Sequence, residues 1–419
     1  MLVFVLQITP RINYVFNLIL RDLAGIDFTF SLNKETFIAS PHPKLSYNTE
    51  KLCDEVFIPC SNLLFETGVI KHQNIKIESQ SRPDDIFAAS FFFASRYEEY
   101  LPFEADIHGR FSALDSLAFK KNVLHLPIVN IWVEILLKEI KNKYPNIHFR
   151  KREFKFINTI DIDSVYAFKN KGILRNTGGF LRDCFKGRGK QMIQRIETLA
   201  HLSKDPFDTF DFLTENINKY NIDSIFFFQV GDYGVFDKNI NIKKKSFQTI
   251  IRNVAAYYSI GLHPSYKSNS NVEIIKREKE CLEDISAVNS KYITSSRFHF
   301  LHFTLPTGYR ALLDAGITDD YSMGFSEVNG FRAGLCTPFH FYDLLLERET
   351  SLMVHPFAIM DVTLLKNSKE KPVINEIRHF IDITKSVNGE FISIFHNQNL
   401  VEEGKWKGWR EIYRQMLAH

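Results

Sequence analysis

Two aspartates separated by one residue, Asp161 and Asp163, give the clearest chemical signal in the sequence. They end the apolar stretch FKFINTID, which favours a buried strand. In an extended chain, residues i and i+2 point the same way, so both carboxylates can face one site. Two close carboxylates raise each other's pKa unless a cation binds one of them, which suggests one metal ligand and one general base. The structural alternative is that one aspartate caps the next helix and the other pairs with Lys or Arg.

Histidines that could bind a metal also follow apolar stretches. His263 comes directly after YYSIGL and precedes Pro264 and Ser265, which turn the chain outward. Catalytic zinc sites use about three protein ligands and leave one position to water, and His is the commonest ligand. A single His is more often structural. A ligand role for His263 gains support because further candidate histidines occur at His299, His302, His355 and His396.

Seven apolar, strand-like segments after residue 154 each end in a polar or ionisable residue. They end at Asp161, near Asp232, at His263, at Arg297 and His299, at Asp320, at His355 and at His396. Short buried strands separated by helices predict parallel βα units, whose carboxyl ends meet on one face. We therefore predict an α/β fold in which residues 151–419 form an irregular (β/α)7 barrel with a polar site at one end.

Residues 1–150 predict a smaller mixed α/β domain of unknown role. LVFVLQI and FTFSL are strand-like, and IVNIWVEILLKEIKNKY has helical periodicity with basic residues at its end. The segment SRYEEYL could place Tyr97, Glu98, Glu99 and Tyr100 at a site. A helix end that docks on the second domain is the interpretation we favour.

Composition excludes several classes of protein. The 419 residues are 45% hydrophobic and 24% charged, as in ordinary globular proteins, and the length favours two domains. The net charge of +3 is small and Lys and Arg are scattered, so neither a nucleic-acid nor a membrane surface is indicated. Five cysteines without a CxxC pair favour reduced thiols. We expect a cytoplasmic protein, because MLVFVLQITPR lacks signal-peptide features and no run could span a bilayer.

From Thr159 to the C-terminus the chain resembles the polysaccharide deacetylase family, also called the NodB-homology or carbohydrate esterase family 4 group. TIDIDS is similar to the first family motif, IFFFQVGD to its Thr-Phe-Phe strand and GLHPS to the second motif. RFHF stands where the family has Arg, any residue, Pro and an aromatic residue, GITDDYS resembles its Tyr-Asp-Ser stretch, and FISIFHN resembles its Leu-any-His motif. More narrowly, the chain is similar to a branch common in Bacteroidetes that has an extra N-terminal domain.

The resemblance implies a role for each matching residue. It makes Asp161 the general base and His396 the general acid that protonates the departing amine. Arg297 would orient the base, and Asp320 would have a supporting role. The metal ligands would be Asp163 and His263, with a divalent ion, zinc by expectation, polarising the acetyl group.

One position departs from the family motif. The family has a second His four residues after the first, whereas this chain has Lys267, and a protonated Lys cannot bind a metal. We predict that His299 completes the site with Asp163 and His263, since an extended segment from Arg297 would direct residues 297 and 299 to one face. The alternative is that Lys267 pairs with Asp163 in a metal-free pocket and His299 only forms a hydrogen bond nearby. His302 and His355 are expected to line or support the pocket.

The expected function is metal-dependent removal of an acetyl group from a carbohydrate, and the absent signal peptide favours a nucleotide-linked or lipid-linked precursor. The motifs GxGxxG, GxSxG and HExxH do not occur, so the enzyme classes that they mark lose support. Two alternatives stay open. The barrel could be a catalytically silent glycan-binding or scaffold protein, or it could hydrolyse an amide that is not on a sugar.

Overall fold

The computed structural model describes all residues except 71–76, 78–80, 287–291 and 368–371. The N-terminal part contains a four-stranded parallel sheet in the order β2-β1-β3-β4. Its strands are β1 (Leu2–Val5), β2 (Thr29–Ser31), β3 (Lys44–Asn48) and β4 (Val56–Pro59). The two strands predicted in this part, in LVFVLQI and FTFSL, are confirmed as β1 and β2.

The N-terminal part also contains helices. They are α1 (Pro10–Phe16), α2 (Lys34–Ala39), α3 (Ile86–Ala94), α4 (Leu117–Lys120) and α5 (Ile128–Lys143), and a π-helical turn (Asn17–Leu23) continues α1. Helix α1 begins where Thr9 accepts a hydrogen bond from the backbone of Ile12, with Pro10 at the first helical position. Helix α5 matches the predicted amphipathic helix. All nine residues of α3 are buried, so this helix is surrounded by protein.

In the described part of the chain, the larger sheet has nine strands in the order β10-β11-β9-β8-β7-β6-β5-β13-β12. Its strands are β5 (Lys155–Ile162), β6 (Asp223–Phe228), β7 (Ser259–Leu262), β8 (Ser295–Ser296), β9 (Asp319–Asp320), β10 (Phe339–Asp343), β11 (Arg348–Val354), β12 (Ile359–Met360) and β13 (Glu390–His396). Every neighbouring pair is parallel except β10 and β11. The mixed α/β class is as predicted, and each of the seven predicted segments contains a strand. The count of seven was wrong, because β12 and the antiparallel β10 also pair with this sheet.

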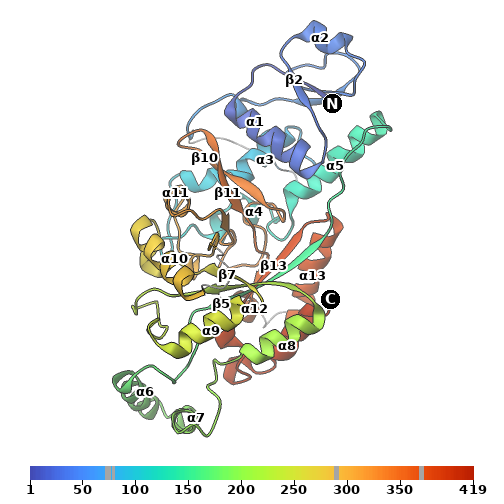
Figure 1. Cartoon of the computed structure of the whole chain (residues 1–419). Coiled ribbons are helices and arrows are strands. Elements are labelled where there is room, and N and C mark those ends of the chain that lie inside the picture. The colour runs from blue at the N-terminus through green and yellow to red at the C-terminus, as the bar shows by residue number, and fades with distance from the viewer. Residues whose placement is uncertain (71–76, 78–80, 287–291, 368–371) are drawn as a thin grey trace.

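Helices connect most of the successive parallel strands, as βα units require, and the last helix follows β13. They are α6 (Ile173–Phe185), α7 (Gly189–Leu199), α8 (Phe210–Tyr220), α9 (Lys245–Ala255), α10 (Val272–Ser286), α11 (Thr307–Asp314), α12 (Asp361–Asn367), α13 (Val373–Ser386) and α14 (Trp409–Leu417). Figure 1 shows the N-terminal part at one end of the molecule and α6 and α7 projecting at the opposite end. Among the described residues, no helix is long and apolar enough to cross a membrane.

The two parts share one continuous core. The hairpin β10–β11 reaches the N-terminal part, where Tyr342 packs on Tyr14 and Phe91 at ring-centroid distances of 4.9 and 5.1 Å. Beside these rings, Arg11 forms an ion pair of 2.5 Å with Glu347. Figure 1 shows this hairpin next to α1 and α3. The N-terminal part is therefore packed onto the larger sheet.

The segment SRYEEYL lies at this interface. Arg96 adopts a left-handed conformation (φ 54°) after α3 and donates to Glu99 at 2.7 Å and to Glu98 at 2.9 Å. Glu99 in turn accepts from Arg332 of the second part at 2.6 and 2.9 Å. Burial raises the pKa of Glu99, but the two guanidinium groups outweigh it and lower the pKa to about 2. The segment docks the N-terminal part on the second part, as favoured from the sequence.

Candidate active site

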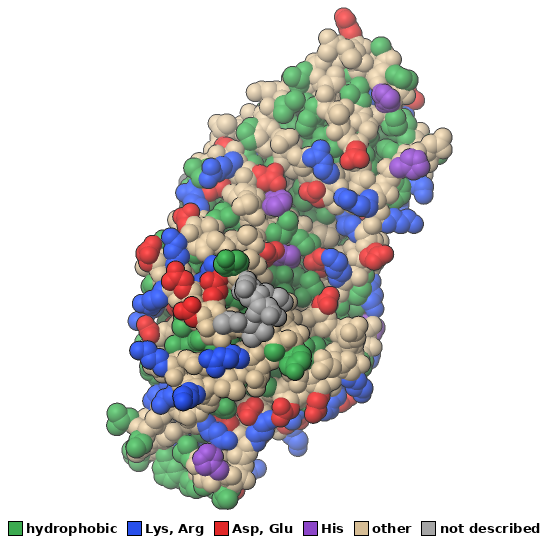
Figure 2. Space-filling view, in the orientation of Figure 1, with side chains coloured by type: hydrophobic (Ala, Val, Ile, Leu, Met, Phe, Trp, Pro, Cys, Tyr) green, Lys and Arg blue, Asp and Glu red, His purple; other side chains and the backbone are tan. Residues whose placement is uncertain are grey.

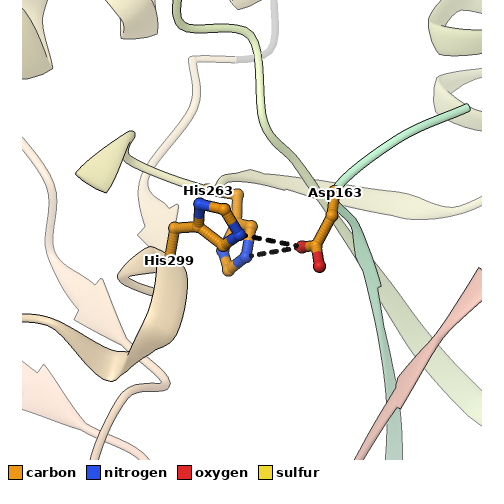
Figure 3. Close-up of side chains that lie close together, drawn as sticks. All are labelled: Asp163, His263 and His299. Carbon is orange, nitrogen blue, oxygen red and sulfur yellow. Dashed lines mark ion pairs between the residues drawn. The ribbon is translucent and has the colours of Figure 1, made fainter. Parts of the chain in front are cut away.

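Asp161 and Asp163 lie where β5 ends, between β6 and β13 of the larger sheet. Asp161 accepts a hydrogen bond from Arg297 Nη1 at 2.9 Å. Asp163 Oδ1 lies 3.3 Å from His263 Nε2 and 3.5 Å from His299 Nε2. Figure 3 shows both imidazole rings directed at this carboxylate. The structure therefore brings the predicted ligand residues together.

Each imidazole is oriented by a partner on its other nitrogen. His263 follows β7, its backbone N–H donates to Phe228, and its Nδ1 lies 2.5 Å from the carbonyl oxygen of Arg297. His299 Nδ1 lies 2.8 Å from the Asp237 carboxylate. Such partners fix the tautomer so that Nε2 presents its lone pair to a metal. Asp237 was missed by the sequence analysis, because no motif marks it and only the fold places it beside His299.

His299 reaches the site by a different path from the one predicted. Strand β8 ends at Ser296 and Phe298 is extended, but residues His299–Leu301 form a 3-10 turn, so the prediction of an extended segment was wrong from His299 onward. Phe300 and Leu301 both have positive φ values, 60° and 52°. This conformation is costly for residues with a Cβ and persists only where surrounding contacts enforce it.

The donor set fits a divalent cation. Asp163, His263 and His299 offer one oxygen and two nitrogen atoms that all lie within 4.8 Å of one another. Asp163 Oδ1 and His263 Nε2 are buried and have no hydrogen-bond partner among the described residues, although buried polar atoms normally have one. Asp163 Oδ2 is occupied separately, since Gln398 donates to it at 2.9 Å. Two imidazoles and one carboxylate are a ligand set typical of zinc and related metals.

Lys267 takes no part in this site. Its side chain is exposed, and the ion pairs that Asp163 forms among the described residues are with His263, His299 and His396. The alternative in which Lys267 pairs with Asp163 was therefore wrong. Lys267 lies in the 3-10 turn Tyr266–Ser268, where its side chain is exposed while Ser268 is buried.

The electrostatics also favour a bound cation. Burial raises the pKa of Asp163, but His299 and His396 outweigh this effect and lower it well below its usual range. Burial lowers the pKa of His299, but Asp163 and Asp237 raise it to about 9. These shifts show that closely spaced carboxylates attract positive charge here, either as protons on imidazole or as a metal ion.

Arg297 and His396 lie on either side of the aspartates. Arg297 is fully buried and also donates to the backbone of Tyr321 and to the side chain of Thr159. His396 ends β13, with Nδ1 2.8 Å from Asp361 and Nε2 3.9 Å from Asp163 Oδ2. Burial lowers the pKa of His396, but Asp361, Asp163 and Asp161 raise it to about 10. Asp361 is a second residue that the sequence analysis missed.

Three other predicted residues lie away from this group. Asp320 is fully buried, accepts hydrogen bonds from Ser296 and Ser322, and does not line the pocket. His355 stacks on Tyr321 at 4.3 Å and also lies outside the pocket lining. His302 stacks on Tyr266 at 4.2 Å, behind the pocket wall. Their side chains support the strand ends without reaching the pocket.

The candidate site opens into a pocket of about 370 Å³. Its floor includes Asp161, Asp163, His263, His299 and His396, and its walls include Phe300, Lys366, Gln398, Lys405 and Trp406. Asp161 and Asp163 are the carboxylates among its lining residues, so positive side chains dominate the rim. Such a pocket is large enough for a sugar unit.

The N-terminal part supplies one wall of this pocket through His108 and Arg110. Both lie in a tight turn, in which Arg110 forms an ion pair of 2.7 Å with Asp106. Arg110 Nη1 also donates to the Phe300 carbonyl at 2.5 Å, and His108 Nδ1 lies 3.0 Å from the Tyr266 hydroxyl. Arg110 thus holds the strained turn that carries His299.

Residues 1–145 match a family model described as "Family of unknown function (DUF7033)". No curated protein matches the chain. The chain is similar to a solved structure described as "putative polysaccharide deacetylase from Mycobacterium smegmatis", at 14% sequence identity and a TM-score of 0.41, over 65% of this chain and 87% of that one. This likeness is too distant to indicate an activity.

Proposed function

We propose that the protein is a metal-dependent hydrolase that removes an acetyl group from a carbohydrate, with zinc held by Asp163, His263 and His299. The observation that carries this proposal is the convergence of these three residues with Asp161 and His396 at the floor of one pocket. When bound, the metal would polarise the acetyl carbonyl and the attacking water.

The chain's own residues supply the proton transfers. Arg297 holds Asp161 Oδ1, which leaves Oδ2 to accept the proton of the attacking water. The water oxygen bonds to the acetyl carbon, and the bond from that carbon to the sugar nitrogen breaks. His396, whose Nδ1 lies 2.8 Å from the Asp361 carboxylate, donates a proton to the departing amine. The products are acetate and the free amino sugar.

The rim indicates which carbohydrate the pocket suits. Lys366 and Lys405 are exposed at the pocket, and the Lys405 ammonium lies 5.3 Å from the centre of the Trp406 ring. Two ammonium groups at the rim of the pocket can contact a phosphate. We therefore propose an acetamido sugar that carries a phosphate-containing group.

Acetate release measures this function directly. The wild-type protein, purified metal-free and then loaded with zinc, is expected to bind about one ion per chain and to release acetate from phosphate-linked acetamido sugars faster than from the neutral sugar. Asp161→Asn should keep the metal and lose turnover, because it removes a base and no ligand. A wild-type protein that binds zinc tightly and releases no acetate from any acetylated sugar would contradict the proposal and favour a silent glycan-binding protein.

A further inference from the structure

Helices α6 and α7, with the residues that flank them, form a projecting unit that we call the α6–α7 hairpin (residues 169–204). Its two helices pack on each other through polar groups. Arg195 donates to Asp183 at 2.8 Å and to Asn176 at 3.1 Å, and both Arg195 and Asp183 are buried. The inward face of the hairpin is therefore polar.

The outward face is apolar. Leu174 and Phe185 are 90% and 89% exposed. The exposed apolar side chains of the hairpin are Ile173, Leu174, Leu181, Phe185, Ile193, Ile196, Leu199 and Leu202. They are eight of the 25 large exposed apolar side chains among the described residues, and Figure 2 shows hydrophobic side chains gathered at this corner of the molecule. Single exposed apolar residues are ordinary, but a concentration of this kind marks an interaction surface.

The same segment is strongly basic. It contains nine Lys and Arg and two acidic residues, a net charge of +7, whereas the whole chain has +3. The small charge of the chain conceals this local concentration, and our expectation from the sequence that Lys and Arg are evenly scattered does not hold here. Helices with Leu, Ile and Phe on one side and many basic residues bind at the surface of anionic membranes. A second copy of the chain would bring the same positive charge to the interface, so charge favours a lipid surface over self-association.

The apolar surface continues from the hairpin toward the pocket. The Arg175 guanidinium lies 4.1 Å from the centre of the Tyr233 ring, and Tyr233 and Val235 are exposed. The next residue, Phe236, lies 5.4 Å from the ring of Phe300, which lines the pocket.

A second connection runs through α7. Gln194 donates to Glu403 at 2.5 Å, and Lys405, two residues further along, lines the pocket. The hairpin is therefore linked to two sides of the pocket mouth.

We propose that the α6–α7 hairpin docks the protein on an anionic lipid surface. Its Leu, Ile and Phe side chains enter the boundary between headgroups and acyl chains, and its Lys and Arg side chains contact phospholipid phosphates. In this orientation the pocket mouth lies near the lipid headgroups. If the proposed function holds, the phosphate-bearing sugar is attached to a lipid.

Vesicle binding by the full chain tests the docking. Wild-type protein is expected to co-sediment with vesicles of phosphatidylcholine and phosphatidylglycerol at least about tenfold more strongly than with phosphatidylcholine alone, and to lose this preference at high salt. Leu174→Ser with Phe185→Ser should weaken binding about 100-fold, because two exposed apolar side chains no longer enter the interface. Lys186→Gln with Arg188→Gln and Lys190→Gln should weaken it to a similar extent.

The matched control is Leu345→Ser with Leu346→Ser. These residues are 60% and 48% exposed and lie between β10 and β11, away from the α6–α7 hairpin. The control should bind vesicles like the wild type. Equal binding by the wild type and both hairpin variants, or no preference for phosphatidylglycerol, would overturn the proposal. So would a lipid-free wild-type dimer that Leu174→Ser with Phe185→Ser abolishes without any vesicle binding.

Activity on a water-soluble acetylated sugar separates this inference from the proposed function. The hairpin variants contain the unaltered pocket, so they should hydrolyse the soluble substrate at the wild-type rate. Loss of vesicle binding with retained hydrolysis supports both proposals. Vesicle binding without hydrolysis by the wild type would leave the docking intact and contradict the proposed function.

Discussion

Replacement of Asp237 by Asn should weaken zinc binding although Asp237 is not a proposed ligand. The Asp237 carboxylate lies 2.8 Å from His299 Nδ1 and also accepts from the backbone of Tyr266 at 3.0 Å. Asn keeps the size and one acceptor oxygen but removes the negative charge. A hydrogen bond to a charged group contributes about 1 kcal/mol more than a neutral one, so the zinc dissociation constant should rise about fivefold. Asp237→Ala also removes the acceptor, and the dissociation constant should rise about 100-fold.

Competition with a chromophoric chelator measures these dissociation constants on metal-free protein. Asp232→Asn is the matched control, since Asp232 lies in the same segment, is 91% exposed in its side chain and pairs at 3.4 Å with Arg277. This control should bind zinc like the wild type. Thermal unfolding of the metal-free variants checks that the fold is kept. Equal zinc affinity in Asp237→Ala and Asp232→Asn, with both proteins folded, would refute the orientation of His299 by Asp237.

Three further predictions concern other parts of the structure. His396→Ala should lower kcat for acetate release by about two to four orders of magnitude with zinc still bound, and unchanged kcat would contradict its role as the acid. Arg110→Ala should weaken zinc binding about tenfold and speed hydrogen exchange in the turn that begins at His299, because this strained turn loses the hydrogen bond from Arg110 to the Phe300 carbonyl. Unchanged hydrogen exchange would show that Arg110 does not hold the turn. The folded-state pKa of Glu99, about 2, lies below its ordinary value of 4.5, so its pairing with Arg332 stabilises the fold above pH 4.5 and loses this effect as the pH falls toward 2. Urea unfolding should show Glu99→Gln to be about 3 kcal/mol less stable than the wild type at pH 7 and the gap shrinking by pH 3, whereas a constant gap would refute the assignment.

The strands and the ligand types could be predicted because they depend on local sequence. Apolar segments such as FKFINTID and GEFISIFH favour burial in any fold, so the strands β5 and β13 could be predicted from the composition and length of these segments. The strands are parallel, so the residues at their ends converge, and this brought Asp163, His263 and His299 within reach of one another. The conformation from His299 onward was predicted wrongly because the turn His299–Leu301 is held by contacts with other segments, such as the hydrogen bond from Arg110 to the Phe300 carbonyl.

The partners of these residues depend on contacts between distant segments. Asp237 and Asp361 lie in segments without a motif, and each becomes important only where the fold places it against a histidine. Arg110 is 190 residues away from Phe300 in the sequence, and no local pattern predicts their hydrogen bond. The outward position of the apolar face of α6–α7 also depends on tertiary contacts. Helical periodicity identifies an amphipathic helix but does not say which face packs inward.

The sequence by itself therefore determined the mixed α/β class, the positions of seven strands of the larger sheet and the residue types of the candidate metal site, since these follow from hydrophobic pattern and side-chain chemistry. The tertiary structure alone decided that Lys267 points to solvent, that Asp320 stays outside the pocket and that the N-terminal part forms a pocket wall. The physical reason is that burial is encoded locally by side-chain polarity, whereas the choice among polar partners depends on which surfaces the packed elements bring within hydrogen-bonding distance.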